Sequence, residues 1–237
     1  MSIAKFLFAP TRLRAAGPLV AALVLSLLLP ANGLASGGAT RVPDASSPPE
    51  SPEQNAEKHY NQGLEHRDKA WELEKRAEQA QGAEAEKLTK KAQKEYAKAV
   101  KSQRNAVTAN PRMYQAHSSL GYALRKTGEF DESIEAYDMA LKLSPGYTEA
   151  IEYRAEAHLA LDRLEDAKSA YLVLLRDDPA RADELMAAMK KWLARSRSGS
   201  SSVSEDEVEA FATWVEERAA VSGHAAMFTA DSSARNW

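Results

Sequence analysis

The chain has 237 residues, 44% of them hydrophobic and 27% charged, which is typical of a folded protein and not of a disordered one. It contains no cysteine, and this excludes disulfides, thiolate metal sites and thiol nucleophiles. The first 35 residues carry three basic residues and no acid, so the formal net charge of −3 becomes −6 without them. This balance gives no support to nucleic-acid binding.

Residues 1–35 are typical of a secretory signal peptide. Three basic residues (Lys5, Arg12 and Arg14) precede an apolar run at 15–29, and small residues stand where a signal peptidase reads the chain. An uncleaved membrane anchor is the alternative, but about 15 apolar residues are short for a span of about 20. We therefore expect an exported protein, periplasmic or secreted after cleavage.

A segment rich in Ser, Pro and Gly at 36–55 is predicted to be a disordered linker. Two long helices are predicted over 56–110, with a break at Gly82. The second of them carries a row of lysines, spaced by four, three, four and three residues, on the side opposite its apolar residues. This basic face comprises Lys87, Lys91, Lys94, Lys98 and Lys101.

Residues 114–147 and 148–180 carry one pattern twice, at a period of 34 residues. Small, aromatic and proline residues recur at matching positions: Gly121 and Ala155, Ser133 and Ala167, Tyr137 and Tyr171, Pro145 and Pro179. This pattern resembles the tetratricopeptide repeat, a helix-turn-helix unit of 34 residues. The resemblance implies an all-α, tetratricopeptide-like helix-turn-helix array with an elongated N-terminal helical hairpin and C-terminal capping helices.

The apolar residues of the two units are expected to form a buried seam. Its members are Leu120, Leu124, Phe130, Ile134, Tyr137, Ala140, Leu141, Ile151, Leu164, Tyr171, Leu174 and Leu175.

The long hairpin at 56–110 has two interpretations that stay open. It is a degenerate, lengthened repeat if Gly63 and Ala99 occupy the small-residue positions, which lie 36 residues apart here and 12 apart from Gly121 to Ser133. Otherwise it is a plain antiparallel hairpin that caps the array. In either case two clear repeats need flanking helices, because a stable stack takes about three units.

The remainder divides into a capping helix at 181–195, a flexible joint at 196–203, a C-terminal helix at 204–221 and a disordered tail at 222–237. Ser204 and Glu207 predict a capping box at the start of the C-terminal helix. Trp214 lies off the apolar stripe of that helix, and it either anchors a partner or packs back onto the repeats. The same two alternatives apply to Trp237.

No catalytic motif or cofactor fingerprint is found in the sequence, so we expect a protein that is not an enzyme and has no cofactor. No two of the five histidines have the HExxH or HxxxH spacing of a helical metal site. His59 and His66 are seven residues apart and lie near each other along a helix, but two histidines with one nearby carboxylate would make a weak site, so we expect no metal. His117 and His158 fall at core positions of the repeat, where packing is the expected role.

The resemblance also implies a concave groove built from the first helix of each unit. Its positions in this chain are Gln115, Ser118, Tyr122, Arg125, Lys126, Glu149, Glu152 and Glu156. Both charge signs are present, which suits a docked peptide or helix. The family's clamp for chaperone tails needs Lys and Asn where this chain has Ser118 and Tyr122, and Asn in place of Tyr153, so we expect no such clamp.

The sequence therefore predicts a non-catalytic scaffold or adaptor of the cell envelope that binds a protein partner in the groove. One alternative is association with an anionic lipid or polymer through the basic face, which salt would weaken. Another is a structural oligomerisation module that uses the long hairpin as a coiled coil. The identity of the partner and the oligomeric state are not fixed by the sequence.

Overall fold

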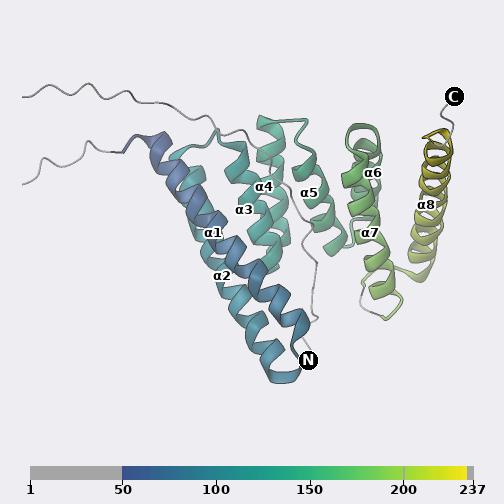
Figure 1. Ribbon diagram of the computed structural model, residues 1–237, viewed down its shortest axis with the longest axis horizontal. Coiled ribbons are helices and arrows are strands. Elements are labelled where there is room, and N and C mark those ends of the chain that lie inside the picture. The colour runs from purple at the N-terminus through teal and green to yellow at the C-terminus, as the bar shows by residue number, and fades with distance from the viewer. Residues whose placement is uncertain (1–49, 200, 234–237) are drawn as a thin grey trace, which may run out of the picture. The chain divides into compact units, whose positions relative to one another are not determined.

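The protein is all-α, as predicted. The computed structural model describes residues 50–199 and 201–233, with side chains to residue 220, and contains eight helices over these residues (Figure 1). They are α1 (Pro52–Gln79), α2 (Gly82–Ala109), α3 (Tyr114–Thr127), α4 (Phe130–Leu143), α5 (Thr148–Ala160), α6 (Leu164–Asp177), α7 (Pro179–Ser196) and α8 (Glu205–Ser233). Consecutive helices pair into hairpins that stack in chain order.

Helix α1 begins within the segment predicted as linker. Ser51 forms a capping box with Gln54, in which the Ser51 hydroxyl accepts from the Gln54 amide (3.2 Å) and the Gln54 side chain accepts from the Ser51 amide (2.9 Å). Pro52 suits the first helical turn because its missing amide would have no partner there. The predicted signal peptide and the predicted linker up to residue 49 lie outside the described residues.

In the first clear repeat, a close approach of α3 and α4 explains the small-residue positions. A Cβ atom on Gly121 would lie 2.8 Å from the buried Tyr137 ring. The Ser133 hydroxyl donates to the Gly121 carbonyl oxygen at 2.8 Å. Gly128 ends α3 in the left-handed conformation (φ 91°), where a side chain would be strained.

The predicted seam is buried or partly buried in all positions except one. Leu175 is 39% exposed. The prediction for Leu175 is wrong because Leu174, the neighbouring residue on α6, fills the core-facing position and is fully buried. Adjacent residues of a helix point about 100° apart and do not share a face.

The long α1–α2 hairpin contains a close approach like that of Gly121 to Tyr137, at equivalent positions of its two helices. A Cβ atom on Gly63 would lie 2.2 Å from Nε2 of the buried Gln103. Gln103 follows Ala99 by four residues, as Tyr137 follows Ser133. This geometry favours the lengthened repeat over a plain capping hairpin.

Helix α7 covers the last repeat with buried Leu185, Met189 and Trp192. The chain between α7 and α8, predicted as a flexible joint, is tied back to the second repeat. Asp162 accepts from the Trp192 indole (3.0 Å), and from the amide (2.9 Å) and hydroxyl (2.7 Å) of Ser202. Ser200 lies outside the described residues.

Helix α8 starts with the predicted capping box, in which the Ser204 hydroxyl accepts from the Glu207 amide at 3.3 Å. The helix continues to Ser233, beyond its predicted end at residue 221. The Trp214 ring packs against Tyr171 (centroids 5.5 Å apart), so it lies on the repeats. Trp237 falls outside the described part of the chain.

None of the helices in the described residues combines the length and hydropathy needed to cross a membrane.

Candidate functional site

The helices that open each hairpin contact one another on one side of the array. Contacts join α1 with α3, α3 with α5, and α5 with α7. We call this side the first-helix face. The resemblance places the predicted groove on this side of the array.

Three aromatic rings cross this face from α1 to α5. The Trp71 indole donates to the Tyr122 hydroxyl at 2.7 Å, with the two rings edge to face. The Tyr122 ring meets Tyr153 of α5 at 5.3 Å. Burial raises the pKa of Tyr122 to about 12, although Arg125 opposes this shift, so the hydroxyl stays protonated near neutrality.

A second aromatic row lies nearer the helix starts. Tyr114 and Tyr147 contact edge to face at 5.1 Å, and Tyr60 of α1 is close enough to both to interact electrostatically. All six rings are partly exposed. Edge-to-face contacts of this kind stabilise the rings and leave part of each surface free for a ligand.

Between α1 and α3, a buried ion pair joins Lys126 to Glu74 at 2.7 Å. Glu74 also accepts from the Tyr96 hydroxyl of α2 (2.8 Å). Burial lowers the pKa of Lys126, and the Glu74 carboxylate partly offsets this effect. Lys126 is therefore occupied within the protein.

Between α3 and α5, Arg125 pairs with Glu156, and both side chains are more than nine-tenths buried. The Arg125 guanidinium lies 5.2 Å from the ring centroids of both Tyr122 and Tyr153. Burial acts to lower the pKa of Arg125, but Glu156 and the surrounding tyrosines outweigh it and raise the pKa. Arg125 stays charged.

Between α5 and α7, Arg181 bonds to Glu152 at 2.5 Å and to Glu149 at 3.4 Å. Glu152 is buried beside Glu156. Burial, followed by the Glu156 charge, raises the pKa of Glu152 to about 7, against the opposing effect of Arg181. Glu152 therefore titrates near neutrality.

The structure brings most of the predicted groove residues together, but it pairs their charges internally. Gln115 is partly exposed, whereas Ser118 is buried. Of the predicted charges, Arg125, Lys126, Glu149, Glu152 and Glu156 all pair across a helix interface.

Sequence reasoning missed several members of this face. Arg181 could have been found by adding one period of 34 to Tyr147, because α7 continues the repeat at Leu185, which follows Ile151 by 34 residues. Glu74 carries no such signal. Its position depends on the extra length of α1.

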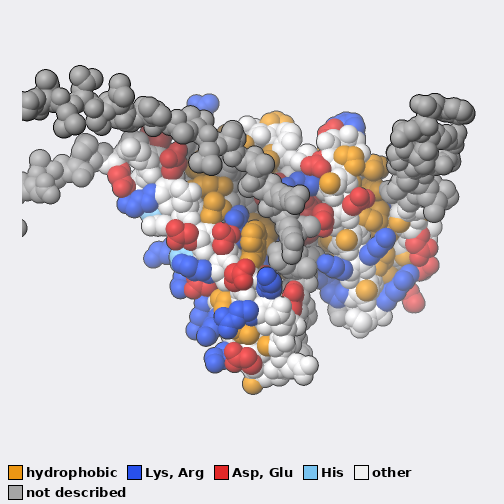
Figure 2. Space-filling view, viewed as in Figure 1, with side chains coloured by type: hydrophobic (Ala, Val, Ile, Leu, Met, Phe, Trp, Pro, Cys, Tyr) orange, Lys and Arg blue, Asp and Glu red, His pale blue; other side chains and the backbone are white. Residues whose placement is uncertain are grey.

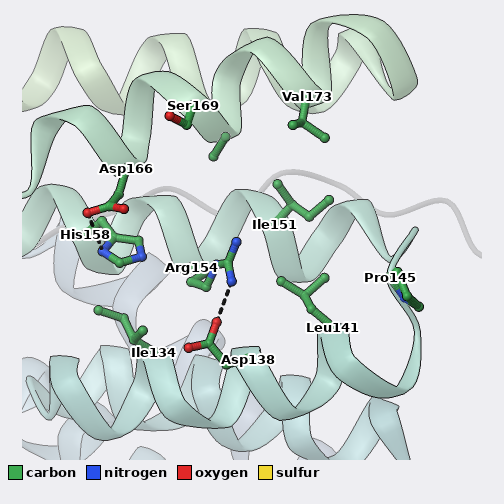
Figure 3. Close-up of a pocket in the computed structure, with 11 residues that line it drawn as sticks. Ile134, Asp138, Leu141, Pro145, Ile151, Arg154, His158, Asp166, Ser169 and Val173 are labelled. Carbon is green, nitrogen blue, oxygen red and sulfur yellow. Dashed lines mark hydrogen bonds and ion pairs between the residues drawn. The ribbon is translucent and has the colours of Figure 1, made fainter.

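A hollow lies on the other side of α5, between α4 and α6 (Figure 3). It measures about 470 Å³ and has apolar walls that include Ile134, Ile151 and Val173. Arg154 forms an ion pair with Asp138, and Nδ1 of His158 lies 3.7 Å from Asp166. Burial lowers the pKa of His158, so its imidazole is neutral at pH 7.

The five lysines of the basic face are all exposed on α2. Their helix packs its opposite side against the core through Leu88, Ala92, Tyr96 and Ala99.

In the described part of the chain, no three His, Asp or Glu side chains converge into a cluster that could hold a metal. His66 instead bonds to Glu95 at 2.8 Å, and His117 contacts the Pro111 carbonyl oxygen at 3.0 Å.

Residues 88–148 match the family model described as Tetratricopeptide repeat. The match begins within α2 and ends at the first residue of α5. It therefore includes the closing part of the long hairpin as well as α3 and α4, in agreement with the contact of Gly63 with Gln103. No curated protein matches the chain.

Two solved structures are similar to this chain. One is titled "First TPR of Spaghetti (RPAP3) bound to HSP90 peptide SRMEEVD" (23% identity, TM-score 0.38, covering 53% of this chain and 94% of that chain). The other is "TPR2B-domain:pHsp70-complex of yeast Sti1" (18% identity, TM-score 0.33, covering 67% of this chain and 98% of that chain).

Proposed function

We propose that this tetratricopeptide-repeat array is a non-catalytic adaptor that binds a partner peptide or helix on its first-helix face. The observation that carries the proposal is the pair of aromatic rows, whose six rings are partly exposed on one side of the array. Aromatic residues supply large contact area with little loss of side-chain entropy, and they dominate protein-binding surfaces.

The ion pairs of the first-helix face limit the kinds of partner that this face can bind. The side chains of Arg125, Lys126 and Glu156 are buried and form ion pairs within the protein, so they do not provide free charges for a ligand. Glu149 and Arg181 are 26% and 20% exposed and lie beside the Tyr147 row. The face therefore suits a segment with apolar or aromatic side chains for the two rows and a polar group near Glu149 and Arg181.

The test is a pull-down of the mature protein against its native extract with matched variants. Tyr153→Ala and Tyr114→Ala each remove a ring from one row, and Tyr153→Phe keeps the ring and removes only the hydroxyl. Leu172→Ala is the control, because Leu172 is 49% exposed and lies on α6, away from the first-helix face. Circular dichroism and thermal unfolding verify that each variant is folded.

We expect the same partner with the wild type, Tyr153→Phe and Leu172→Ala, and its loss with the two alanine variants of the rows. A partner retained by both of those variants, or lost with Leu172→Ala, contradicts the proposal. Arg125→Glu is unsuitable for this test, since it places two carboxylates in one buried pair and unfolds the array.

The proposal places this adaptor in the cell envelope. It is supported by the basic front, apolar run and small-residue cleavage site of residues 1–35. Cell fractionation followed by N-terminal sequencing tests it. We expect a mature chain that starts near Ser36 outside the cytoplasm, whereas an intact N-terminus in the cytoplasmic fraction contradicts export.

A further inference from the structure

The basic face on α2 has no role in the first-helix face. Its five lysines point away from α1, and all are exposed. Within the described residues, Lys87 contacts Glu84 at 3.4 Å and Lys98 contacts Glu95 at 2.6 Å, and no other acid lies within ion-pair distance of these five lysines. Three of them are thus available for a partner.

The surroundings of the basic face do not favour insertion into a lipid bilayer. Helices that lie in a membrane interface carry large apolar residues beside the basic ones. Among the described residues, the exposed large hydrophobic side chains are Met139, Leu143, Leu172 and Leu175, on α4 and α6. None lies on α2, so the partner of the basic face is recognised by charge.

The last helix presents the opposite charge. On α8, the side away from the buried Phe211, Ala212 and Val215 is acidic. The exposed acids of this helix are Glu205, Asp206, Glu207, Glu209, Glu216 and Glu217. One of them, Glu209, has a contact with a base, at 3.8 Å from Arg197. Figure 2 shows Lys and Arg gathered over the lower part of the α1–α2 hairpin, and Asp and Glu at the edge of α8.

The two faces match in length as well as in charge. Lys87 to Lys101 spans 14 residues and Glu205 to Glu217 spans 12. At 1.5 Å per residue, each row is therefore about 20 Å long. The faces belong to the first hairpin and the last helix of the array, and among the described residues α2 and α8 are not a contacting pair of helices. The α8 helix of a second copy can therefore supply the acidic face that the basic face of α2 does not meet within its own chain.

We propose that the basic face of α2 binds the acidic face of α8 from a second copy of this chain. The contact is head to tail, so each copy keeps one free basic face and one free acidic face, and the assembly grows as a chain of copies. Because exposed ion pairs contribute little individually and are screened by salt, the association is weak and is lost at high ionic strength.

Sedimentation velocity with charge-reversal variants tests the proposal. One variant carries Lys91→Glu, Lys94→Glu and Lys98→Glu, and the other carries Glu209→Lys, Glu216→Lys and Glu217→Lys. All six side chains are exposed, and two of them, Lys98 and Glu209, also form ion pairs at the surface. Circular dichroism verifies that each variant is folded. We expect the wild type to associate at 20 mM salt, with at least a tenfold weaker association at 300 mM.

We expect each variant to be monomeric alone, and an equimolar mixture of the two to associate. A variant that carries all six reversals should also self-associate. A wild type that is monomeric at low salt overturns the proposal, as does a mixture that stays monomeric. Binding of the wild type to vesicles of anionic phospholipid, without self-association, would assign the basic face to a membrane surface.

Discussion

The first-helix face and the basic face contain the same kinds of charged side chain in opposite settings. On the first-helix face, Arg125 and Glu156 are more than nine-tenths buried and join two helices from successive hairpins. On the basic face, Lys98 and Glu95 belong to one helix, and the lysine is 56% exposed. The two pairs therefore differ in what surrounds them and not in their chemistry.

This difference separates structural charges from charges available for recognition. A buried pair has lost its hydration, so removing one partner leaves an uncompensated charge in an apolar site. An exposed pair remains solvated, and removing one partner leaves the other in water. The ion pairs of the first-helix face thus hold successive hairpins in register. Loss of the ion pairs within α2 should change the stability of the fold very little.

The largest expected effect follows from breaking the buried pair. Arg125→Met should lower the free energy of unfolding by about 3–5 kcal/mol, because Glu156 is left without its partner. Urea unfolding followed by circular dichroism measures this loss. The double variant Arg125→Met/Glu156→Leu should recover a large part of it, since no buried charge remains. A loss below about 1 kcal/mol in the single variant would mean that the pair is solvated.

The second expected effect is a pH dependence that originates at Glu152. Its folded-state pKa of about 7 lies above the ordinary value of 4.5 because of burial and the Glu156 charge. The protonated form is therefore favoured in the fold. This contribution is fully present below about pH 4.5 and is lost as the pH rises through 7, with a size of about 3 kcal/mol at most.

Urea unfolding of the wild type and of Glu152→Gln at pH 5 and pH 8 isolates this contribution. The charged groups around the site (Arg125, Glu149, Glu156, Asp178 and Arg181) are common to both proteins, and their effects cancel in the difference. We expect the wild type to lose more stability than the variant between pH 5 and pH 8. Equal losses would exclude Glu152 as the titrating group.

The smallest expected effect comes from the Lys98–Glu95 pair, whose lysine is 56% exposed. Lys98→Ala should change the free energy of unfolding by no more than about 0.5 kcal/mol, despite the 2.6 Å contact with Glu95. The same urea experiment measures it, with Arg125→Met as the reference. A loss comparable to that of Arg125→Met would remove the distinction between the two faces.

The repeat period of 34 residues correctly predicted much of the fold. Tyr137, Tyr171 and the small residues opposite them are buried where the pattern placed them, because close helix packing leaves room only for small side chains there. The start of α1 was not predicted correctly. A single capping residue, Ser51, decides it, inside a segment whose composition indicates disorder.

The candidate site was predictable in location but not in its pairings. The period identifies the face that carries Tyr122 and Arg125. It does not identify the partner of each charge, since Lys126 meets Glu74 across 52 residues and only because α1 extends past the end of an ordinary repeat. Trp71, on the same extension, was missed as a member of the face for the same reason.

In the proposed function, aromatic rings on the first-helix face, and not its charges, bind the partner. The most direct measurement is isothermal titration of a peptide selected from a displayed library on the wild-type protein, against Tyr153→Ala, Tyr153→Phe and Leu172→Ala. We predict that Tyr153→Ala weakens binding at least tenfold while the other two bind within twofold of the wild type. Unchanged affinity in Tyr153→Ala, with the fold intact, would contradict the claim.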